Sequence, residues 1–272
     1  MRNDPYRGKT IVITGASSGI GEAAAKQLAA RGAIVCLVAR REEELARVAG
    51  EIEAAGGIAH AYSANLAESE SIDALVELLR ADHPRIDALV NNAGRSIRRP
   101  ILESLDRAHD FERTMQLNYL AVVRLTLGLL PSMLEHGDGH IINVSSVAAL
   151  MTTPRFAAYL ASKSALDAFS RSLRIELEEK GIAVTAINYP LVKTAMTAPT
   201  AIYKYLPQMD VADAAGWIVE AIATRPARKT IRTALAFHVA TAVLPGPTLK
   251  VLSSFYARRA AKLRQKLEQS QA

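Results

Sequence analysis

Residues 14–21 read TGASSGIG, at the end of an apolar run that begins at Lys9. Glycines at such a turn let the backbone approach a pyrophosphate closely, and a helix that starts there offers it unpaired N–H groups and the positive end of its dipole. The spacing, Gly-x-x-x-Gly-x-Gly, differs from the commonest dinucleotide fingerprint, so an ordinary turn before a helix is the alternative. Its position at the first strand–helix junction favours a dinucleotide-binding turn. The predicted contacts are Gly15, Ser17, Ser18, Gly19, Ile20 and Gly21.

The rest of the chain alternates short apolar runs with longer helical patterns, which is typical of βαβ units around a parallel sheet. We expect strands near residues 9–15, 33–39, 58–65, 86–94, 140–146, 182–190 and 229–234. We expect helices near residues 20–31, 41–57, 69–84, 109–135, 156–180 and 211–224, with an irregular segment at 191–209. The pattern therefore predicts an α/β fold.

Length and composition predict one domain of 272 residues, with a core at 8–235 and a helical extension at 236–272. The single Cys36 cannot form an internal disulfide and fits a reducing compartment. The N-terminus has no apolar signal segment, and the stretch 233–249 is shorter than a membrane-spanning helix. We therefore expect a cytoplasmic protein, and no metal site is predicted.

The second predicted strand ends in Val38-Ala39-Arg40-Arg41, with no carboxylate before Glu42. An acidic residue at this point would bind the ribose hydroxyls of NAD, whereas a guanidinium pairs with a 2′-phosphate. The sequence thus predicts NADP(H) as the cofactor, held by Arg40 first and Arg41 second. The alternative is that both are solvated arginines that open a helix.

Tyr159 and Lys163 lie four residues apart, and therefore on one face of the predicted helix 156–180. A free tyrosine titrates near 10, too high for efficient proton transfer at neutral pH, and a nearby ammonium lowers that pKa. Such a pair is common by chance. Ser145 and Ser146, at the end of the preceding strand, make a catalytic role more specific.

The motifs TGASSGIG, NNAG, INVSS and YLASK, together with Asn118 in MQLNYL, resemble in order and spacing those of the short-chain dehydrogenase/reductase family. The resemblance covers about residues 8–230. It implies a Rossmann-like, doubly wound parallel sheet of about seven strands with helices on both faces, followed here by a helical C-terminal extension. It also implies a catalytic tetrad of Asn118, Ser146, Tyr159 and Lys163.

The resemblance assigns a role to each member of this tetrad. Ser146 would donate a hydrogen bond to the substrate oxygen, and Tyr159 would deliver the proton. Lys163 would lower the tyrosine pKa and hold the nicotinamide ribose, while Asn118 would hold a water that relays protons. Asn91, Ala93 and Gly94 would pack beside the adenine ribose and brace the sheet. Further cofactor contacts are expected at Asn65, Leu66, Asn92, Ala93, Gly94, Tyr159, Lys163, Pro190, Val192 and Thr194.

Two positions depart from the family pattern. Asn65 replaces the usual Asp beside the adenine, although its amide oxygen can still accept a hydrogen bond. Leu191 follows Pro190 where glycine is usual, which places a bulky side chain near the nicotinamide.

The substrate pocket is expected to be lined by residues 95–100, Leu150, Met151 and the segment 191–209. Most of these are apolar and none evidently awaits an anion, which favours a lipophilic carbonyl or alcohol such as a fatty aldehyde, an acyl thioester or a ketone. A 3-oxoacyl reductase and a steroid or polycyclic alcohol dehydrogenase are alternatives within the enzyme class. A non-catalytic NADP(H)-sensing regulator is the alternative outside it.

The extension contains two predicted helices broken at residues 245–247, and it turns basic after Tyr256. It resembles, more loosely, the tails of family members that reduce fatty aldehydes or acyl-CoA thioesters. We expect it to cover the pocket mouth and to touch a membrane surface or an anionic carrier; an ordinary packed helix pair is the alternative. The basic residues match no nucleic-acid motif. The family resemblance implies a homodimer or homotetramer through helices 109–136 and 156–180.

Overall fold

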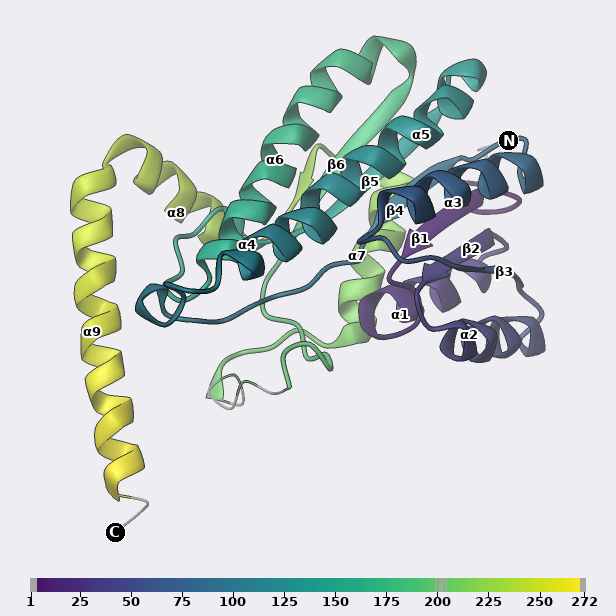
Figure 1. Ribbon diagram of the computed structural model, residues 1–272. Coiled ribbons are helices and arrows are strands. Elements are labelled where there is room, and N and C mark those ends of the chain that lie inside the picture. The colour runs from purple at the N-terminus through teal and green to yellow at the C-terminus, as the bar shows by residue number, and fades with distance from the viewer. Residues whose placement is uncertain (1–3, 199, 201–202, 204, 270–272) are drawn as a thin grey trace.

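The computed structural model describes residues 4–269 except 199, 201, 202 and 204, and it describes side chains as far as residue 258 (Figure 1). The strands are β1 Thr10–Thr14, β2 Ile34–Ala39, β3 Ile58–Ser63, β4 Ala88–Asn91, β5 Gly139–Ser146, β6 Ile182–Tyr189 and β7 Arg228–Lys229. The α-helices are α1 Gly19–Ala29, α2 Glu42–Ala54, α3 Ser69–Asp82, α4 Ala108–Met115, α5 Ala121–His136, α6 Ala157–Leu177, α7 Val211–Thr224, α8 Arg232–Val243 and α9 Pro245–Gln269. Short helical turns are η1 Ile101–Glu103, η2 Gln116–Leu120, η3 Val147–Ala149 and η4 Glu178–Lys180.

The strands form one parallel sheet in the order β3-β2-β1-β4-β5-β6-β7, with helices on both faces (Figure 1). This confirms the expected Rossmann-like sheet of seven strands. The order reverses between β1 and β4, and sheets of this kind bind ligands outside the carboxyl ends of their strands at such a point. The candidate site lies there.

Strand β1 shows how the sequence builds two cores. Ile11 and Ile13 face one cluster of buried side chains, which α1, α2 and α7 complete. Val12 points to the opposite cluster, which includes side chains from α3, α5 and α6. All three β1 side chains are fully buried, as expected for a strand in a parallel sheet covered on both faces.

The helix expected at 109–135 is found, but it is not uniform. It runs from Ala108 to His136 and changes to π-helical pairing over η2, which contains Asn118. By length and composition this continuous helix is also apolar enough to cross a membrane. Its α5 part packs against α3, however, and the core helix of a globular domain passes the same test.

The last strand and the extension differ in part from expectation. The strand predicted at 229–234 is wrong beyond its first residue, because β7 is only Arg228–Lys229 and α8 begins at Arg232. The two predicted helices of the extension are present, with α8 ending at Val243 and α9 beginning at Pro245. Proline is well suited to the first position of a helix, where its missing N–H has no intrahelical partner. Of the basic tail residues, Arg258 is described, whereas the side chains of Arg259, Lys262, Arg264 and Lys266 lie outside the described residues.

Candidate active site

The glycine turn between β1 and α1 has the geometry that a phosphate-binding backbone requires. Gly15 and Gly19 have φ values of +67° and +60°, in the left-handed region that favours glycine. A Cβ on Gly21 would lie 2.3 Å from the Gly15 carbonyl oxygen, so the turn and the helix touch backbone to backbone. Ser17, Ser18 and Ile20 line the same cavity. All six predicted turn residues are therefore brought together at the amino end of α1.

The segment after β4 is fixed by Thr14, which is not among the predicted site residues. The Thr14 hydroxyl accepts hydrogen bonds from the backbone N–H groups of Asn92 and Ala93, both at 2.9 Å. The Asn92 amide donates to the Thr14 carbonyl at 2.9 Å and to the Gly15 carbonyl at 3.3 Å. Asn92, Ala93 and Gly94 line the cavity as predicted. The threonine before the first glycine was the available sequence signal.

Asn91 agrees with only half of its prediction: it braces the sheet, but its side chain is buried away from the cofactor cavity. Its amide nitrogen donates to Asn143 Oδ1 at 2.9 Å and to Thr126 Oγ1 at 3.3 Å. Asn143 in turn donates to Ser170 Oγ at 2.9 Å. This polar network joins β4, β5, α5 and α6, so Asn91 braces the sheet and does not line the cofactor cavity.

Both predicted arginines reach the far end of the cavity. Arg40 and Arg41 are exposed and line it beside Ser17. Arg41 Nη2 donates to Ser17 Oγ at 3.3 Å, and its other contact is a long ion pair with Glu44 at 3.9 Å. Arg41, ranked second in the sequence, is thus the arginine held over the glycine turn.

Asn65 and Leu66, which follow the neighbouring strand β3, also line the cavity. Asn65 Nδ2 donates to Glu68 Oε1 at 2.6 Å, and its Oδ1 accepts from the N–H of Ala67 at 3.2 Å. One lone pair of Oδ1 stays available to an adenine amino group. Leu66 is buried with 6% exposure and would offer an apolar surface to the adenine ring.

Three members of the predicted tetrad, Ser146, Tyr159 and Lys163, line the cavity, and the fourth, Asn118, is buried behind its wall. Ser146 ends β5, while Tyr159 and Lys163 lie on one face of α6. Asn118 is fully buried in the π-helical segment η2. A π-helical turn inside an α-helix is frequently found at functional sites, since it redirects side chains that a regular helix would point elsewhere.

The Asn118 amide makes three hydrogen bonds to neighbouring segments. Its Nδ2 donates to the Arg95 carbonyl and to Ser162 Oγ, both at 2.9 Å, and its Oδ1 accepts from the Arg95 N–H at 2.8 Å. The side chain therefore clamps the chain after Gly94 to α6. Its Oδ1 keeps a second lone pair, and the relay water expected at Asn118 stays a prediction. Ser162, three residues after Tyr159 in YLASK, was missed as the other half of this clamp.

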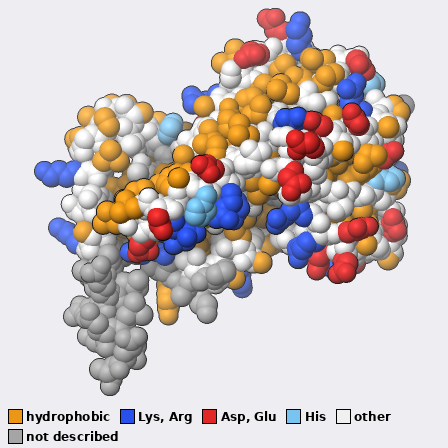
Figure 2. Space-filling model, viewed as in Figure 1, with side chains coloured by type: hydrophobic (Ala, Val, Ile, Leu, Met, Phe, Trp, Pro, Cys, Tyr) orange, Lys and Arg blue, Asp and Glu red, His pale blue; other side chains and the backbone are white. Residues whose placement is uncertain are grey.

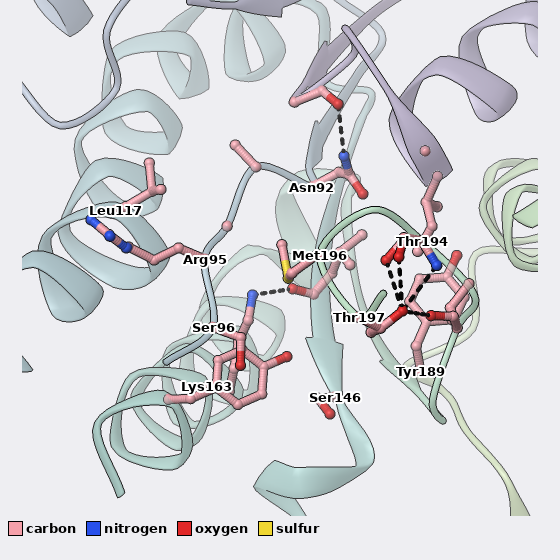
Figure 3. A pocket seen from close by; sticks show the side chains of 18 of the residues that line it. Asn92, Arg95, Ser96, Leu117, Ser146, Lys163, Tyr189, Thr194, Met196 and Thr197 are labelled. Carbon is pink, nitrogen blue, oxygen red and sulfur yellow. Dashed lines mark hydrogen bonds between the residues drawn. The ribbon is translucent and has the colours of Figure 1, made fainter. Parts of the chain in front are cut away.

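Lys163 is buried with 4% exposure, and its Nζ donates to the Val144 carbonyl at 2.7 Å (Figure 3). Burial lowers the pKa of Lys163 to about 8, because the charged form loses hydration. The ammonium is therefore a cation below about pH 8. Burial also raises the pKa of Tyr159, and interaction with the Ser146 hydroxyl opposes that rise. Proton exchange at neutral pH thus depends on a neighbouring cation that favours the phenolate.

The segment after β6 closes the cavity over the glycine turn. Val192 pairs with Met209, and the Thr194 N–H donates to Thr197 Oγ1 at 3.0 Å. The Thr194 methyl is the nearest atom to a Cβ built on Gly19, at 3.7 Å. Pro190, Leu191, Val192 and Thr194 all line the cavity. Leu191 does not have a positive φ, so replacing the usual glycine causes no backbone strain.

The whole cavity has a volume of about 1340 Å³. This exceeds the 300–1,000 Å³ of typical small-molecule pockets and suits a dinucleotide with a second ligand beside it. The glycine cradle, the two arginines and the buried lysine fit a nicotinamide dinucleotide phosphate. Beyond Tyr159 the wall includes Phe156, Met196 and Leu206.

The predicted substrate wall needs two corrections. Leu150 and Met151 do not line the cavity, because η3 turns Leu150 into the interior with 3% exposure; Thr153 and Phe156 take their place. Charged groups are present, contrary to expectation. Arg95 and Arg98 line the cavity, and neither guanidinium has a hydrogen bond or ion pair with a described residue. Figure 3 shows Arg95 pointing toward Leu117 and away from Lys163.

Comparison with known proteins agrees with this geometry. The family model for short chain dehydrogenases matches residues 9–202. A fatty acyl-CoA reductase from Acinetobacter baylyi and another from Mycobacterium tuberculosis are each 50% identical over 239 residues, which is 88% of this chain and 81% of each relative. The chain belongs to the short-chain dehydrogenase family, and it is an NAD(P)-dependent oxidoreductase.

Solved structures give the same result. A putative NAD(P)-dependent gluconate 5-dehydrogenase from Beutenbergia cavernae, with bound NADP, has a TM-score of 0.76 and 31% identity, covering 84% of this chain and 96% of that one. An actinorhodin polyketide ketoreductase with NADPH has a TM-score of 0.75 and 28% identity, covering 82% and 94%.

Proposed function

We propose that this protein uses NADPH to reduce a long-chain acyl thioester to the aldehyde. The observation that carries the proposal is the 50% identity, over 88% of the chain, to two relatives named fatty acyl-CoA reductase. The substrate end of the cavity supports it, since Phe156, Met196 and Leu206 offer apolar surface to an acyl chain. The unpaired guanidinium groups of Arg95 and Arg98 suit the phosphates of a thioester carrier.

The tetrad can perform the required proton chemistry. When bound, NADPH supplies the hydride that adds to the thioester carbon. Ser146 donates a hydrogen bond to the carbonyl oxygen as negative charge grows there, and Tyr159 delivers a proton to it. Lys163, while charged, stabilises the tyrosinate that results. The carbon–sulfur bond then breaks, so each thioester consumes one hydride and one proton and gives an aldehyde and a thiol.

The proposal is tested by NADPH oxidation with acyl-CoA thioesters of graded chain length, alongside free aldehydes, 3-oxoacyl thioesters and a steroid ketone. We expect kcat/KM to rise with the length of the acyl chain, because each buried methylene contributes about 0.8 kcal/mol, or about fourfold. Aldehyde and thiol should appear in equal amounts. Turnover of 3-oxoacyl or steroid substrates alone would contradict the proposal, and so would binding of NADPH without any turnover.

The preference for NADPH is proposed to depend on Arg40 and Arg41. The double variant Arg40→Ala/Arg41→Ala should raise the Kd of NADPH by about 10- to 100-fold, because it removes charge-assisted contacts that each contribute about 1.5–3 kcal/mol before solvent screening. The Kd of NADH should change little. Fluorescence titration measures both. Arg80→Ala, an exposed arginine of α3 outside the cavity, is the matched control; an equal loss of affinity for both cofactors would refute the assignment.

We further propose a cytoplasmic homo-oligomer with peripheral membrane contact. Cys36 is buried, and burial raises the pKa of its thiol to about 12, which suits a reducing compartment.

The proposed oligomer rests on three exposed leucines. Leu120, Leu127 and Leu134 repeat every seven residues along η2 and α5 and are 47%, 55% and 41% exposed. This stripe supports helix pairing between two copies. A monomeric mass in light scattering would argue against it.

A further inference from the structure

Helix α8 is apolar on most sides, yet the rest of the molecule leaves most of it uncovered. Leu235, Val239, Val243 and the following Leu244 are 46%, 54%, 70% and 58% exposed. Ala234 is its one fully buried side chain among the described residues. A helix that is apolar all round is normally buried in a core or in lipid. The surface of α8 therefore lacks the cover that its composition requires.

Helix α9 continues this surface. Leu249, Val251 and Phe255 are 41%, 71% and 54% exposed. Together α8 and α9 form an arm, residues 232–258, that projects from the body of the molecule (Figure 1). We call it the C-terminal arm.

The charge of the C-terminal arm has one sign. Between Arg232 and Arg258 the sequence contains no aspartate or glutamate, whereas Arg232, Lys250 and Arg258 are basic. The next eight residues add four more Lys and Arg. Exposed apolar surface combined with lysine and arginine is the composition of segments that lie in the interface of an anionic membrane.

A second apolar group lies on the same side of the molecule. Ile101, Leu102 and Leu105, in and just after η1, are 59%, 80% and 82% exposed. We call residues 101–105 the η1 loop. Figure 1 shows this loop facing α9, and Figure 2 shows hydrophobic side chains gathered on that margin of the molecule. Three large apolar side chains within five residues are unusual on a water-facing loop.

Both surfaces lie close to residues that line the cavity. Tyr203 lines the cavity, and its pKa is raised mainly by burial and also by Tyr256 of α9, so the arm approaches the cavity wall. Arg98 lies three residues before the η1 loop and lines the cavity. Its positive charge lowers the pKa of Tyr203 and so opposes the effect of burial. The C-terminal arm and the η1 loop thus both lie near the cavity, although no described residue of either lines it.

We propose that the C-terminal arm and the η1 loop bind an anionic membrane surface together, so that the mouth of the cavity opens at the lipid headgroups and the acyl chain enters from the bilayer. The entry of the acyl chain rests on the proposed function, whereas the membrane surface itself does not. A second copy of the chain fits the arm less well. A two-fold contact would place Arg232, Lys250 and Arg258 against the same cations of the partner.

The test is sedimentation of the full-length protein with vesicles of phosphatidylcholine alone, and of phosphatidylcholine with phosphatidylglycerol. Binding to the anionic vesicles is expected, with weakening at high salt. The pairs Leu102→Ser/Leu105→Ser and Val239→Ser/Val243→Ser should each weaken binding by about 10-fold or more, since each removes two large apolar side chains from the interface. Leu78→Ser is the matched control, because Leu78 is 55% exposed on α3 and lies away from the mouth.

The variants must retain the parent's thermal unfolding and its turnover of a short-chain, water-soluble thioester. Anionic vesicles should raise the parent's turnover of a long-chain thioester and should not raise that of either double variant. No binding of the parent, or equal binding by parent and variants, overturns the membrane surface. The membrane surface is also overturned if the parent self-associates in the absence of vesicles and both double variants abolish that self-association. Vesicle binding without reduction of any thioester supports the membrane surface and overturns the proposed function.

Discussion

Replacing Tyr159 with phenylalanine is expected to lower kcat for thioester reduction by about 10²- to 10⁴-fold, the usual contribution of a positioned general acid. The phenol is the group of the tetrad placed to give a proton to the substrate oxygen. The substitution keeps the ring, whose edge-on contact with Phe156 has a centroid separation of 6.3 Å. The Kd of NADPH should therefore stay within about threefold, which is less than 1 kcal/mol. Single-turnover oxidation of NADPH and fluorescence titration measure the two quantities.

A second tyrosine in the same cavity provides the control. Tyr189 ends β6, lines the cavity and donates its hydroxyl hydrogen bond to the Ala214 carbonyl. Tyr189→Phe should cost about 1 kcal/mol of unfolding free energy, because the carbonyl loses its partner, and should leave kcat within about threefold. If Tyr159→Phe retains kcat, or if both variants lose it equally, Tyr159 is not the acid.

The elements that could be predicted from the sequence are those with a local cause. The glycines of TGASSGIG lie where the backbone has a positive φ or where another backbone segment approaches closely. Both conditions favour glycine, so the residue type alone predicts them. Tyr159 and Lys163 share a face of α6 because four residues make about one helical turn. The strands of the sheet interior, such as β1 and β2, are largely continuous apolar runs since both faces are covered.

What could not be predicted depends on contacts between distant segments. Asn118 makes three hydrogen bonds, to Arg95 and Ser162, in the π-helical segment η2. The hydrophobic periodicity of residues 108–136 does not predict them. Arg228 offers a second case. It binds Asp167 at 2.7 Å and Asn188 at 2.8 Å, which holds a two-residue β7 where the apolar pattern suggested a longer strand further on.

The cofactor turn allows a similarly sharp prediction at Gly21. A Cβ there would lie 2.3 Å from the Gly15 carbonyl oxygen and 2.6 Å from Asn92 Nδ2. The first of these neighbours is backbone, so the turn itself must move. Gly21→Ala should therefore destabilise the fold by about 1–3 kcal/mol, as overpacked sites do. It should also weaken NADPH binding by about 10-fold or more, because the displaced groups shape the phosphate cradle.

Gly50 tests whether this effect is local, because it is another glycine within a helix. It lies in α2, and a Cβ built on it meets nothing within 4 Å. Gly50→Ala should instead stabilise the protein by about 0.5–1 kcal/mol, since alanine is the better helix former, and should leave the Kd of NADPH unchanged. Chemical denaturation and cofactor titration of both variants give the comparison. We expect the free energy of unfolding to fall in Gly21→Ala and to rise in Gly50→Ala, with weaker NADPH binding in Gly21→Ala alone. Equal behaviour of the two variants would mean that the close contact between Gly21 and Gly15 does not position the cofactor.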